Sequence, residues 1–230
     1  MQIIKQQHSL PVGDLVSHLF STSSEQRHGS LFPSSIRCLI AGPSGCGKTN
    51  LLLTLITSLN GVRFQNIYIF AKSLYQPLYV FLEQVMSGLR NMGYFTFAAH
   101  EDVISPDNVR PHSLMIFDDV ATERQGIIQA YFSMGRHKYI DCFYLAQTYS
   151  RIPKQLIRDN ANVIVLFRQD ERNMHHVYDD HVNPDMTFLA FTQLCATCWN
   201  AHHHGCLVID KQSDINNGRY RMGFDHFIRI

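Results

Sequence analysis

The run with the clearest chemical meaning reads GPSGCGKT and covers residues 42–49. It fits the pattern G-x-x-x-x-G-K-[ST], in which a glycine-rich loop joins a strand to a helix. The chain on either side agrees with this context, because residues 36–41 are apolar as in a strand and residues 51–59 are patterned as in a helix. The alternative, a glycine-rich turn that binds nothing, is weak in this context. The run predicts a phosphate-binding loop and therefore a nucleotide-binding protein.

The positions of this loop have expected roles. Gly42, Gly45 and Gly47 allow positive φ, which turns backbone N–H groups inward and forms a concave anion site at the positive end of the next helix. Lys48 is expected to reach the β- and γ-phosphates, and the Thr49 hydroxyl is expected to bind Mg²⁺. The predicted nucleotide-binding residues are Gly42, Pro43, Ser44, Gly45, Cys46, Gly47, Lys48 and Thr49.

Two carboxylates follow a second apolar stretch. Residues 114–117 read LMIF and lead directly into Asp118 and Asp119. This is the form of a Walker B strand, in which Asp118 would hold Mg²⁺ through its water shell and Asp119 would orient or deprotonate the attacking water. Many ring ATPases have Glu at the second position, so Glu123 is a second candidate for the base. The alternative is that the two Asp residues only cap the next helix.

Two polar residues flank the predicted strand at residues 140–146. Gln147 directly follows this strand and would face the γ-phosphate. Its amide can hydrogen-bond phosphate or water there and so report which nucleotide is bound. The alternative is that Gln147 is an ordinary polar residue at a strand end. Arg136 precedes the strand and would lie at the opposite edge of the sheet, far from its own nucleotide. We expect Arg136 to reach a neighbouring subunit's γ-phosphate as an arginine finger in trans; a solvated surface Arg is the alternative.

Three basic residues lie around a helix predicted to begin at Pro153. Lys154 and Arg158 are four positions apart and would share one helix face, next to Arg151. They are candidate contacts to DNA phosphates, with an ordinary solvated face as the alternative. Arg151 and Arg158 are also second-choice arginine fingers, because both are expected near the same sheet edge as Gln147.

A cluster near the C-terminus has residue types that bind zinc. Its members are Cys195, Cys198, His202, His203, His204 and Cys206. The spacing is compressed compared with ordinary zinc modules, so core thiols and surface histidines are the favoured interpretation. Residues 208–214 match the guanine-reading N-K-x-D motif poorly, because Asp210 replaces its Asn and the second Asp falls one residue late. ATP is therefore favoured over GTP.

The elements that must position these residues alternate along the chain. Strands are predicted at residues 36–41, 66–70, 94–98, 114–117, 140–146 and 163–167, and helices at 51–59, 78–89 and 127–134. This order predicts an α/β fold of the P-loop NTPase class, of the ASCE or RecA-like type, with a mostly parallel central sheet flanked by helices on both faces. The carboxyl ends of parallel strands share one edge, where ligands collect.

Composition limits the number of domains and the classes of protein to which the chain can belong. The chain has 230 residues and 45% hydrophobic content, which suits one domain with a full core, and its apolar runs are too short and interrupted to span a membrane. The N-terminus lacks the apolar core of a signal peptide, and the cysteine positions suit reduced thiols. We expect a soluble, intracellular protein. The formal net charge of +1 does not indicate a nucleic-acid binder, so any DNA contact must come from a local patch.

Together these motifs resemble one family. The loop GPSGCGKT, the strand LMIFDD and the stretch GRHKYIDCFYLAQTYSRIPKQLIRDNANVIVLF are similar to the FtsK/HerA superfamily. Within it, they resemble the genome-packaging ATPases of poxvirus-like large DNA viruses, virophages and Polinton-type elements. The resemblance covers residues 36–170 and extends weakly to RYRMGFD. In the family a Gln ends the strand after Walker B, as Gln147 does here, and an Arg precedes that strand, as Arg136 does. The Asp-Asp pair departs from the Asp-Glu of cellular translocases but suits the viral branch.

The resemblance implies a homo-oligomeric ring, a pentamer or hexamer, that hydrolyses ATP with Mg²⁺ and drives double-stranded DNA into a preformed capsid at its vertex. Its expected location is the cytoplasm or nucleus of an infected host cell, or the virion. Residues 1–35 are expected to form a loosely packed lead-in, and residues 36–230 a single P-loop ATPase domain with a small C-terminal extension from about residue 170. Alternatives are a cellular-type FtsK/HerA DNA translocase, a small-molecule (nucleoside) kinase, and a nucleotide-dependent switch or scaffold.

Overall fold

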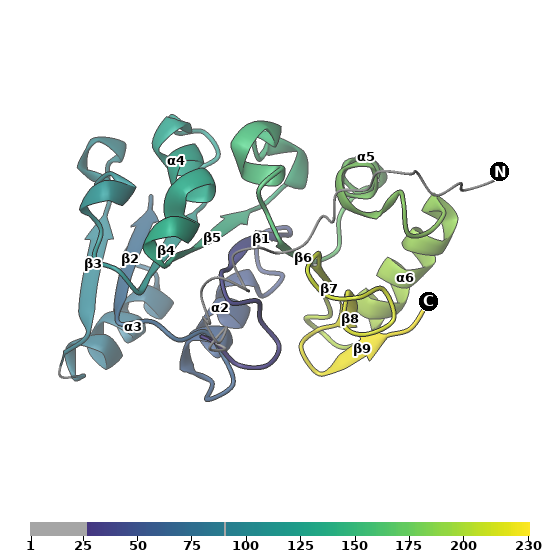
Figure 1. Ribbon diagram of the computed structural model, residues 1–230, viewed down its shortest axis with the longest axis horizontal. Helices are drawn as coiled ribbons and strands as arrows, with labels where there is room; N and C mark the ends of the chain where they lie inside the picture. The colour runs from purple at the N-terminus through teal and green to yellow at the C-terminus, as the bar shows by residue number, and fades with distance from the viewer. Residues whose placement is uncertain (1–26, 90) are drawn as a thin grey trace, which may run out of the picture.

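The strands of the protein form one continuous twisted sheet. The computed structural model describes residues 27–89 and 91–230, so most of the predicted lead-in lies outside the described residues. Within the described part, the strand order is β3-β2-β4-β5-β1-β6-β7-β8-β9 (Figure 1). The parallel strands are β1 (Arg37–Ala41), β2 (Asn66–Ala71), β3 (Gly93–Phe97), β4 (Ser113–Asp118), β5 (Ile140–Ala146) and β6 (Val163–Leu166).

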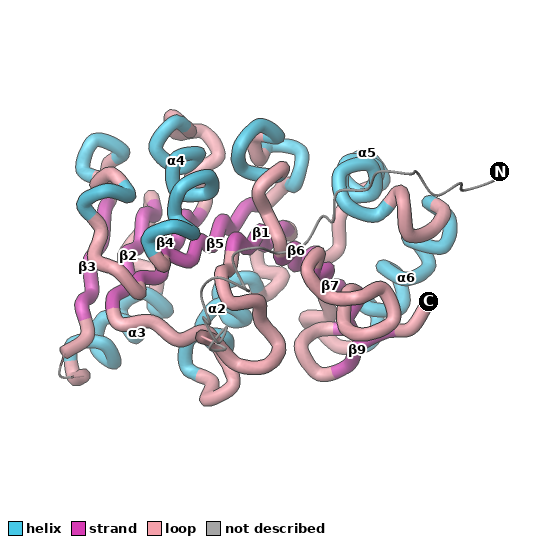
Figure 2. The backbone as a smooth tube through the Cα atoms, viewed as in Figure 1, coloured by secondary structure: helices cyan, strands magenta, loops and turns pink. Residues whose placement is uncertain are grey.

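Helices cover both faces of this sheet (Figure 2). One face is covered by α2 (Lys48–Thr57) and α3 (Pro77–Ser87), and the other by α4 (Gly126–Met134), α5 (Glu171–Val177) and α6 (Phe188–Ala201). The sequence dictates this layering, because side chains alternate across a strand. In β4, for example, Phe117 joins one core cluster and Ile116 joins the other. The predicted α/β fold, with a mostly parallel sheet between helices, is confirmed.

Residues after about 170 extend the same sheet. They form α5, α6 and three strands, β7 (Leu207–Asp210), β8 (Tyr220–Met222) and β9 (His226–Ile228), which pair antiparallel from β6 outward. Asp210, considered above for guanine recognition, instead lies 2.9 Å from the guanidinium of Arg221 and accepts a hydrogen bond from Ser213. It therefore holds the β7–β8 turn. Among the described residues, no helix combines the length and apolar character needed to cross a membrane.

The described end of the lead-in is pinned rather than loosely packed. Asp141 is fully buried at the start of β5, and its carboxylate lies 3.0 Å from Arg27 and 3.2 Å from the His28 imidazole. It also accepts a hydrogen bond from the backbone N–H of Ile36. A buried carboxylate requires such partners, so residues 27–36 are bound to the amino edge of the sheet.

The helix predicted to begin at Pro153 is irregular. Residues Lys154–Arg158 contain two positions with non-helical backbone, Gln155 and Leu156, and Leu156 has a φ of 63°. The expectation that Lys154 and Arg158 share a regular helix face is therefore wrong. Their relation is set instead by a common partner, Asp180, described below.

Candidate active site

The loop at residues 42–49 joins β1 to α2 at the carboxyl edge of the sheet. Gly45 and Gly47 have φ of 75° and 106°, as expected for a loop that turns its N–H groups inward. Gly42 differs from the expectation, because its φ is not positive. A Cβ there would lie 2.5 Å from Cβ of Phe167 and 2.6 Å from Sγ of Cys46. Gly42 is thus required by close packing, while Gly45 and Gly47 supply the left-handed backbone.

The side chain of Lys48 folds over the loop. Its ammonium donates hydrogen bonds to the carbonyl of Gly42, at 2.6 Å, and of Pro43, at 2.9 Å. Lys48 and Thr49 begin α2, so both stand at the positive end of that helix. This arrangement places a cation and a hydroxyl beside a ring of backbone donors, which suits a polyphosphate and its metal ion.

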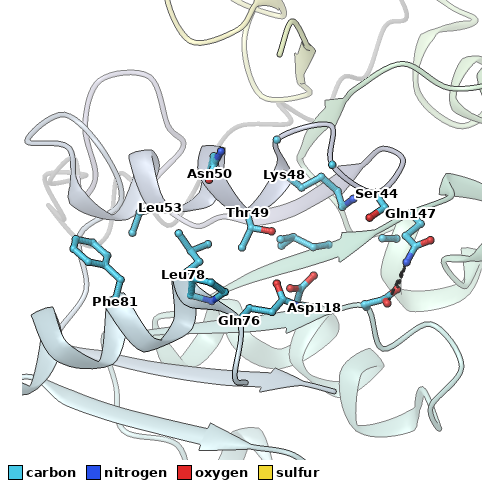
Figure 3. Close-up of a pocket in the computed structure, with 16 residues that line it drawn as sticks. Ser44, Lys48, Thr49, Asn50, Leu53, Gln76, Leu78, Phe81, Asp118 and Gln147 are labelled. Carbon is cyan, nitrogen blue, oxygen red and sulfur yellow. Dashed lines mark hydrogen bonds between the residues drawn. The ribbon is translucent and has the colours of Figure 1, made fainter. Parts of the chain in front are cut away.

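Asp118 is the last residue of β4 and faces Lys48 and Thr49 across the pocket (Figure 3). The Tyr79 hydroxyl, from α3, donates a hydrogen bond to its Oδ2 atom. Burial raises the pKa of the Asp118 carboxyl and nearby Asp119 adds to the increase, whereas the Tyr79 hydrogen bond and the charge of Lys48 act in the opposite direction. A buried carboxylate with this balance favours a cation as its next partner.

Asp119 and Gln147 form a linked pair at the same edge. The Gln147 amide donates to both carboxylate oxygens of Asp119, at 3.3 and 3.2 Å (Figure 3). Asp119 has a φ of 54°, in the left-handed region, and this exposed residue lines the cleft. The two residues directly follow β4 and β5, which are adjacent in the sheet. A carboxylate that can orient water is therefore coupled to an amide that can contact phosphate.

These groups line one cleft of about 710 Å³. Figure 3 shows α2 on one side and α3 on the other, with Leu53, Leu78 and Phe81 at the end remote from Lys48. The cleft is polar where the loop, Asp118 and Gln147 meet and apolar between the two helices. The lining residues that were predicted from sequence are Ser44, Gly45, Gly47, Lys48, Thr49, Asp118, Asp119 and Gln147.

Glu123, the second candidate for the base, has another partner. Its carboxylate lies 2.9 Å from the ammonium of Lys72, at the end of β2, and Lys72 also donates to the Thr122 hydroxyl. Glu123 does not line the cleft. A smaller cavity of about 150 Å³ lies next to the cleft and is lined by Lys72, Arg151, Asp119 and Gln147 among others. Arg151 is therefore near the site, while Glu123 is held by Lys72.

Arg136 lies far from this cleft, as the sequence suggested. It is exposed on a short 3₁₀ turn, Gly135–Lys138, which ends one residue before β5, whereas Gln147 directly follows β5. The seven residues of β5 span roughly 23 Å at a strand rise of about 3.3 Å per residue. Arg136 therefore stands at the opposite edge of the sheet from its own phosphate loop.

Lys154 and Arg158 both contact one carboxylate. Asp180 lies 3.2 Å from the Lys154 ammonium and 2.7 Å from the Arg158 guanidinium. Arg158 is 8% exposed, and its guanidinium stacks over the Tyr149 ring. The expectation that Arg158 contacts DNA, or serves as an arginine finger, is therefore contradicted: its charge is internal and already paired. Lys154 keeps most of its side chain in solvent.

The Cys/His cluster is divided between two environments. Cys195 and Cys198 are buried in α6 and belong to one core cluster, whereas Cys206 belongs to the core cluster on the other face. Burial raises the pKa of all three thiols, to about 11 for Cys198 and about 12 for Cys206. His202 and His203 are exposed. In the part of the chain that the structure describes, no group of three His, Cys, Asp or Glu residues is arranged to hold a metal ion.

Two residues of the site escaped sequence analysis. Tyr79 lies in the helix predicted at residues 78–89, and no local pattern distinguishes it from a core tyrosine. His204 was placed in the Cys/His cluster, yet its ring contacts the phosphate loop. Both contacts join segments far apart in the chain, so the sequence carries no signal for them.

The fold and the site together define a P-loop nucleotide-binding protein. The chain belongs to the family described as Poxvirus A32 protein, whose model matches residues 23–182. No functionally curated protein matches the chain in a comparison of sequences.

Solved structures with a similar fold include proteins from two Sulfolobus viruses. The genome packaging NTPase B204 from Sulfolobus turreted icosahedral virus 2, in complex with sulfate, is 12% identical with a TM-score of 0.56 over 85% of this chain and 98% of that chain. The DNA-packaging ATPase B204 from Sulfolobus Turreted Icosahedral Virus is 13% identical, with a TM-score of 0.53 over 84% and 97% of the two chains. Identities this low establish a shared fold and no more.

Proposed function

We propose that this protein is the ATPase of a viral genome-packaging motor, which hydrolyses ATP and translocates double-stranded DNA into a preformed capsid in an infected cell. The observation that carries the proposal is the meeting of the phosphate loop, the Asp118–Asp119 pair and Gln147 in one cleft. Membership of the Poxvirus A32 protein family supports it. A structure of the genome packaging NTPase B204 from Sulfolobus turreted icosahedral virus 2 in complex with ATP-gammaS also has a similar fold. It is 10% identical to this chain, with a TM-score of 0.51 over 84% of this chain and 98% of that chain.

The residues of the cleft fit a Mg²⁺ ion together with a nucleotide. Thr49 and Asp118 offer the hard oxygen ligands that Mg²⁺ prefers, and a site with so few protein ligands leaves positions for waters and phosphate oxygens. When bound, the ion would neutralise charge on the β- and γ-phosphates. Lys48 and the loop N–H groups would hold the phosphates, and Asp119 would orient the attacking water or take its proton. Gln147 would link the state of the γ-phosphate to Asp119.

Two features support an oligomeric, DNA-bound form. Arg136 cannot serve its own cleft, so we propose that it completes the site of a neighbour in a homo-oligomeric ring. Arg151 and Lys154 are the remaining candidates for DNA phosphates, since Arg158 is buried. A ring with these properties fits a motor at the capsid vertex, in the cytoplasm or nucleus of the host.

The test is the steady-state rate of ATP hydrolysis by purified protein, with and without linear double-stranded DNA, across a salt series. Lys48→Ala serves as the blank. We expect DNA to raise the rate and salt to remove the effect, because contacts to phosphates release counterions. Hydrolysis that ignores DNA but increases with a nucleoside acceptor would replace this proposal with a small-molecule kinase.

A further inference from the structure

The C-terminal part of the chain touches the phosphate loop through one imidazole. Nδ1 of His204 lies 2.9 Å from the carbonyl oxygen of Cys46, although 158 positions separate the two residues. A carbonyl only accepts hydrogen bonds, so Nδ1 is the donor and carries a proton. His204 follows α6 and lies beyond residues 23–182, which the family model matches.

The ring of His204 also packs on Gly47. A Cβ at Gly47 would lie 2.9 Å from Cγ and 3.0 Å from Nδ1 of the imidazole. Glycine is therefore needed at this position twice, for its φ of 106° and for the close approach of the ring. The imidazole therefore covers the loop, and His204 is not among the residues that line the cleft.

The segment that carries His204 is anchored on both sides. Before it, the Trp199 indole N–H donates to the carbonyl of Leu166 in β6, at 2.8 Å. After it, Leu207 begins β7 and pairs with Leu166. Between them, a Cβ at Gly205 would lie only 2.3 Å from the carbonyl oxygen of Cys198, so the turn closes tightly against α6. His204 is thus presented to the loop by the sheet itself.

We propose that His204 is a positioning residue for nucleotide binding. The carbonyl and N–H of a trans peptide point in opposite directions. By bonding the Cys46 carbonyl outside the loop, His204 keeps the N–H of Gly47 directed toward the cleft that Gly45, Gly47 and Lys48 line. A glycine peptide turns over easily, so this one needs an external hold. The inference rests on the proposed function, since the N–H that His204 orients would bind a phosphate of the nucleotide.

The test compares His204→Ala, His204→Asn and His204→Gln in the full chain. The Asn amide nitrogen can occupy the place of Nδ1, whereas the Gln amide extends one carbon further. We expect His204→Ala to weaken binding of a non-hydrolysable ATP analogue roughly fivefold, the effect of losing one ordinary hydrogen bond. KM for ATP should rise equally with kcat changed by less than about twofold, because the contact is the same in ground and transition states. Asn should restore affinity and Gln should not.

The matched control is His202→Ala, which removes a histidine as exposed as His204 from the same turn and should bind the analogue like the wild type. Thermal unfolding without nucleotide should be alike for all variants. Wild-type affinity in His204→Ala, or equal rescue by Gln and Asn, would overturn the inference while leaving the proposed function intact. Failure of the wild-type protein and of His202→Ala to bind the analogue would overturn the proposed function, and this inference with it.

Discussion

At the scale of single residues, the two candidate bases differ in what holds them. Asp119 is exposed to the cleft and bonded to Gln147, whereas Glu123 is paired with Lys72 outside it. We expect Asp119→Asn to lower the rate of ATP hydrolysis about 100-fold or more while nucleotide affinity is kept, because a general base is lost. Glu123→Gln should change the rate by less than about threefold, since only a surface pair is removed. Single-turnover assays with both variants decide, and the reverse order would transfer the base to Glu123.

Tyr79 bears on the metal site through Asp118. Its hydrogen bond lowers the pKa of that carboxyl against the increase caused by burial. Because the ionised carboxylate is the form that binds a cation, activity should fall as pH drops through this pKa. Tyr79→Phe removes the hydroxyl, raises the pKa and should move the acidic limb of the pH–rate profile to higher pH.

We also expect Tyr79→Phe to weaken the apparent Mg²⁺ affinity on the order of tenfold, as for other residues that orient a metal ligand. The measurement is the rate of hydrolysis against pH at fixed MgATP, followed by a Mg²⁺ titration at neutral pH. A matched control is Tyr94→Phe, whose hydroxyl donates to the backbone carbonyl of Tyr79, at 3.4 Å, and not to Asp118. An unshifted acidic limb would show that Tyr79 has no effect on Asp118.

At the scale of elements, the irregular segment before β6 is held by one carboxylate. Asp180 bonds Arg158, which is buried, and Lys154, which is exposed. We expect Arg158→Ala to lower the free energy of unfolding by about 1.5–3 kcal/mol, because it removes a buried hydrogen bond between charged groups while Asp180 keeps Lys154 and the Tyr149 hydroxyl as partners. Lys154→Ala should cost less than about 1 kcal/mol, as for a surface ion pair. Denaturant unfolding of both variants measures the difference, and similar small losses would place Arg158 outside the core.

At the scale of the whole molecule, the nucleotide cleft and Arg136 lie at opposite ends of the strands. The nucleotide cleft lies at the carboxyl ends of the strands, and Arg136 lies at the amino end of β5. If Arg136 acts in trans, Arg136→Ala should bind nucleotide normally but hydrolyse it about 1,000-fold more slowly, as when an arginine finger is removed.

Mixing two inactive variants tests this arrangement. Lys48→Ala subunits keep Arg136 and can complete the intact cleft of an Arg136→Ala neighbour, so a mixture should regain part of the ATPase rate. The control replaces Lys48→Ala with the double variant Lys48→Ala/Arg136→Ala, which has no finger to supply. Mixed rings without any recovery would contradict a finger in trans.

Much of the fold was readable because it is encoded locally. The predicted strands became β1 to β6, and the helices predicted at residues 51–59, 78–89 and 127–134 became α2, α3 and α4. Continuous apolar runs mark the inner strands of the sheet, and apolar residues at helical spacing mark the helices. The strands β7 to β9 were not predicted from the sequence, because each has only three or four residues and pairs antiparallel with a neighbouring strand. Whether the segment after about residue 170 is a separate extension stays a prediction.

By itself, the sequence determined the chemistry of the phosphate loop, the acidic end of β4 and the family resemblance, because these depend on neighbouring residues and fixed spacing. Tertiary structure alone decided which polar groups meet across the sheet. It brought Tyr79 to Asp118 and His204 to Cys46, and it turned Arg158 inward to Asp180. The physical reason is that a hydrogen bond or ion pair is made where distant elements pack, and no local pattern records which surfaces the core will bring together.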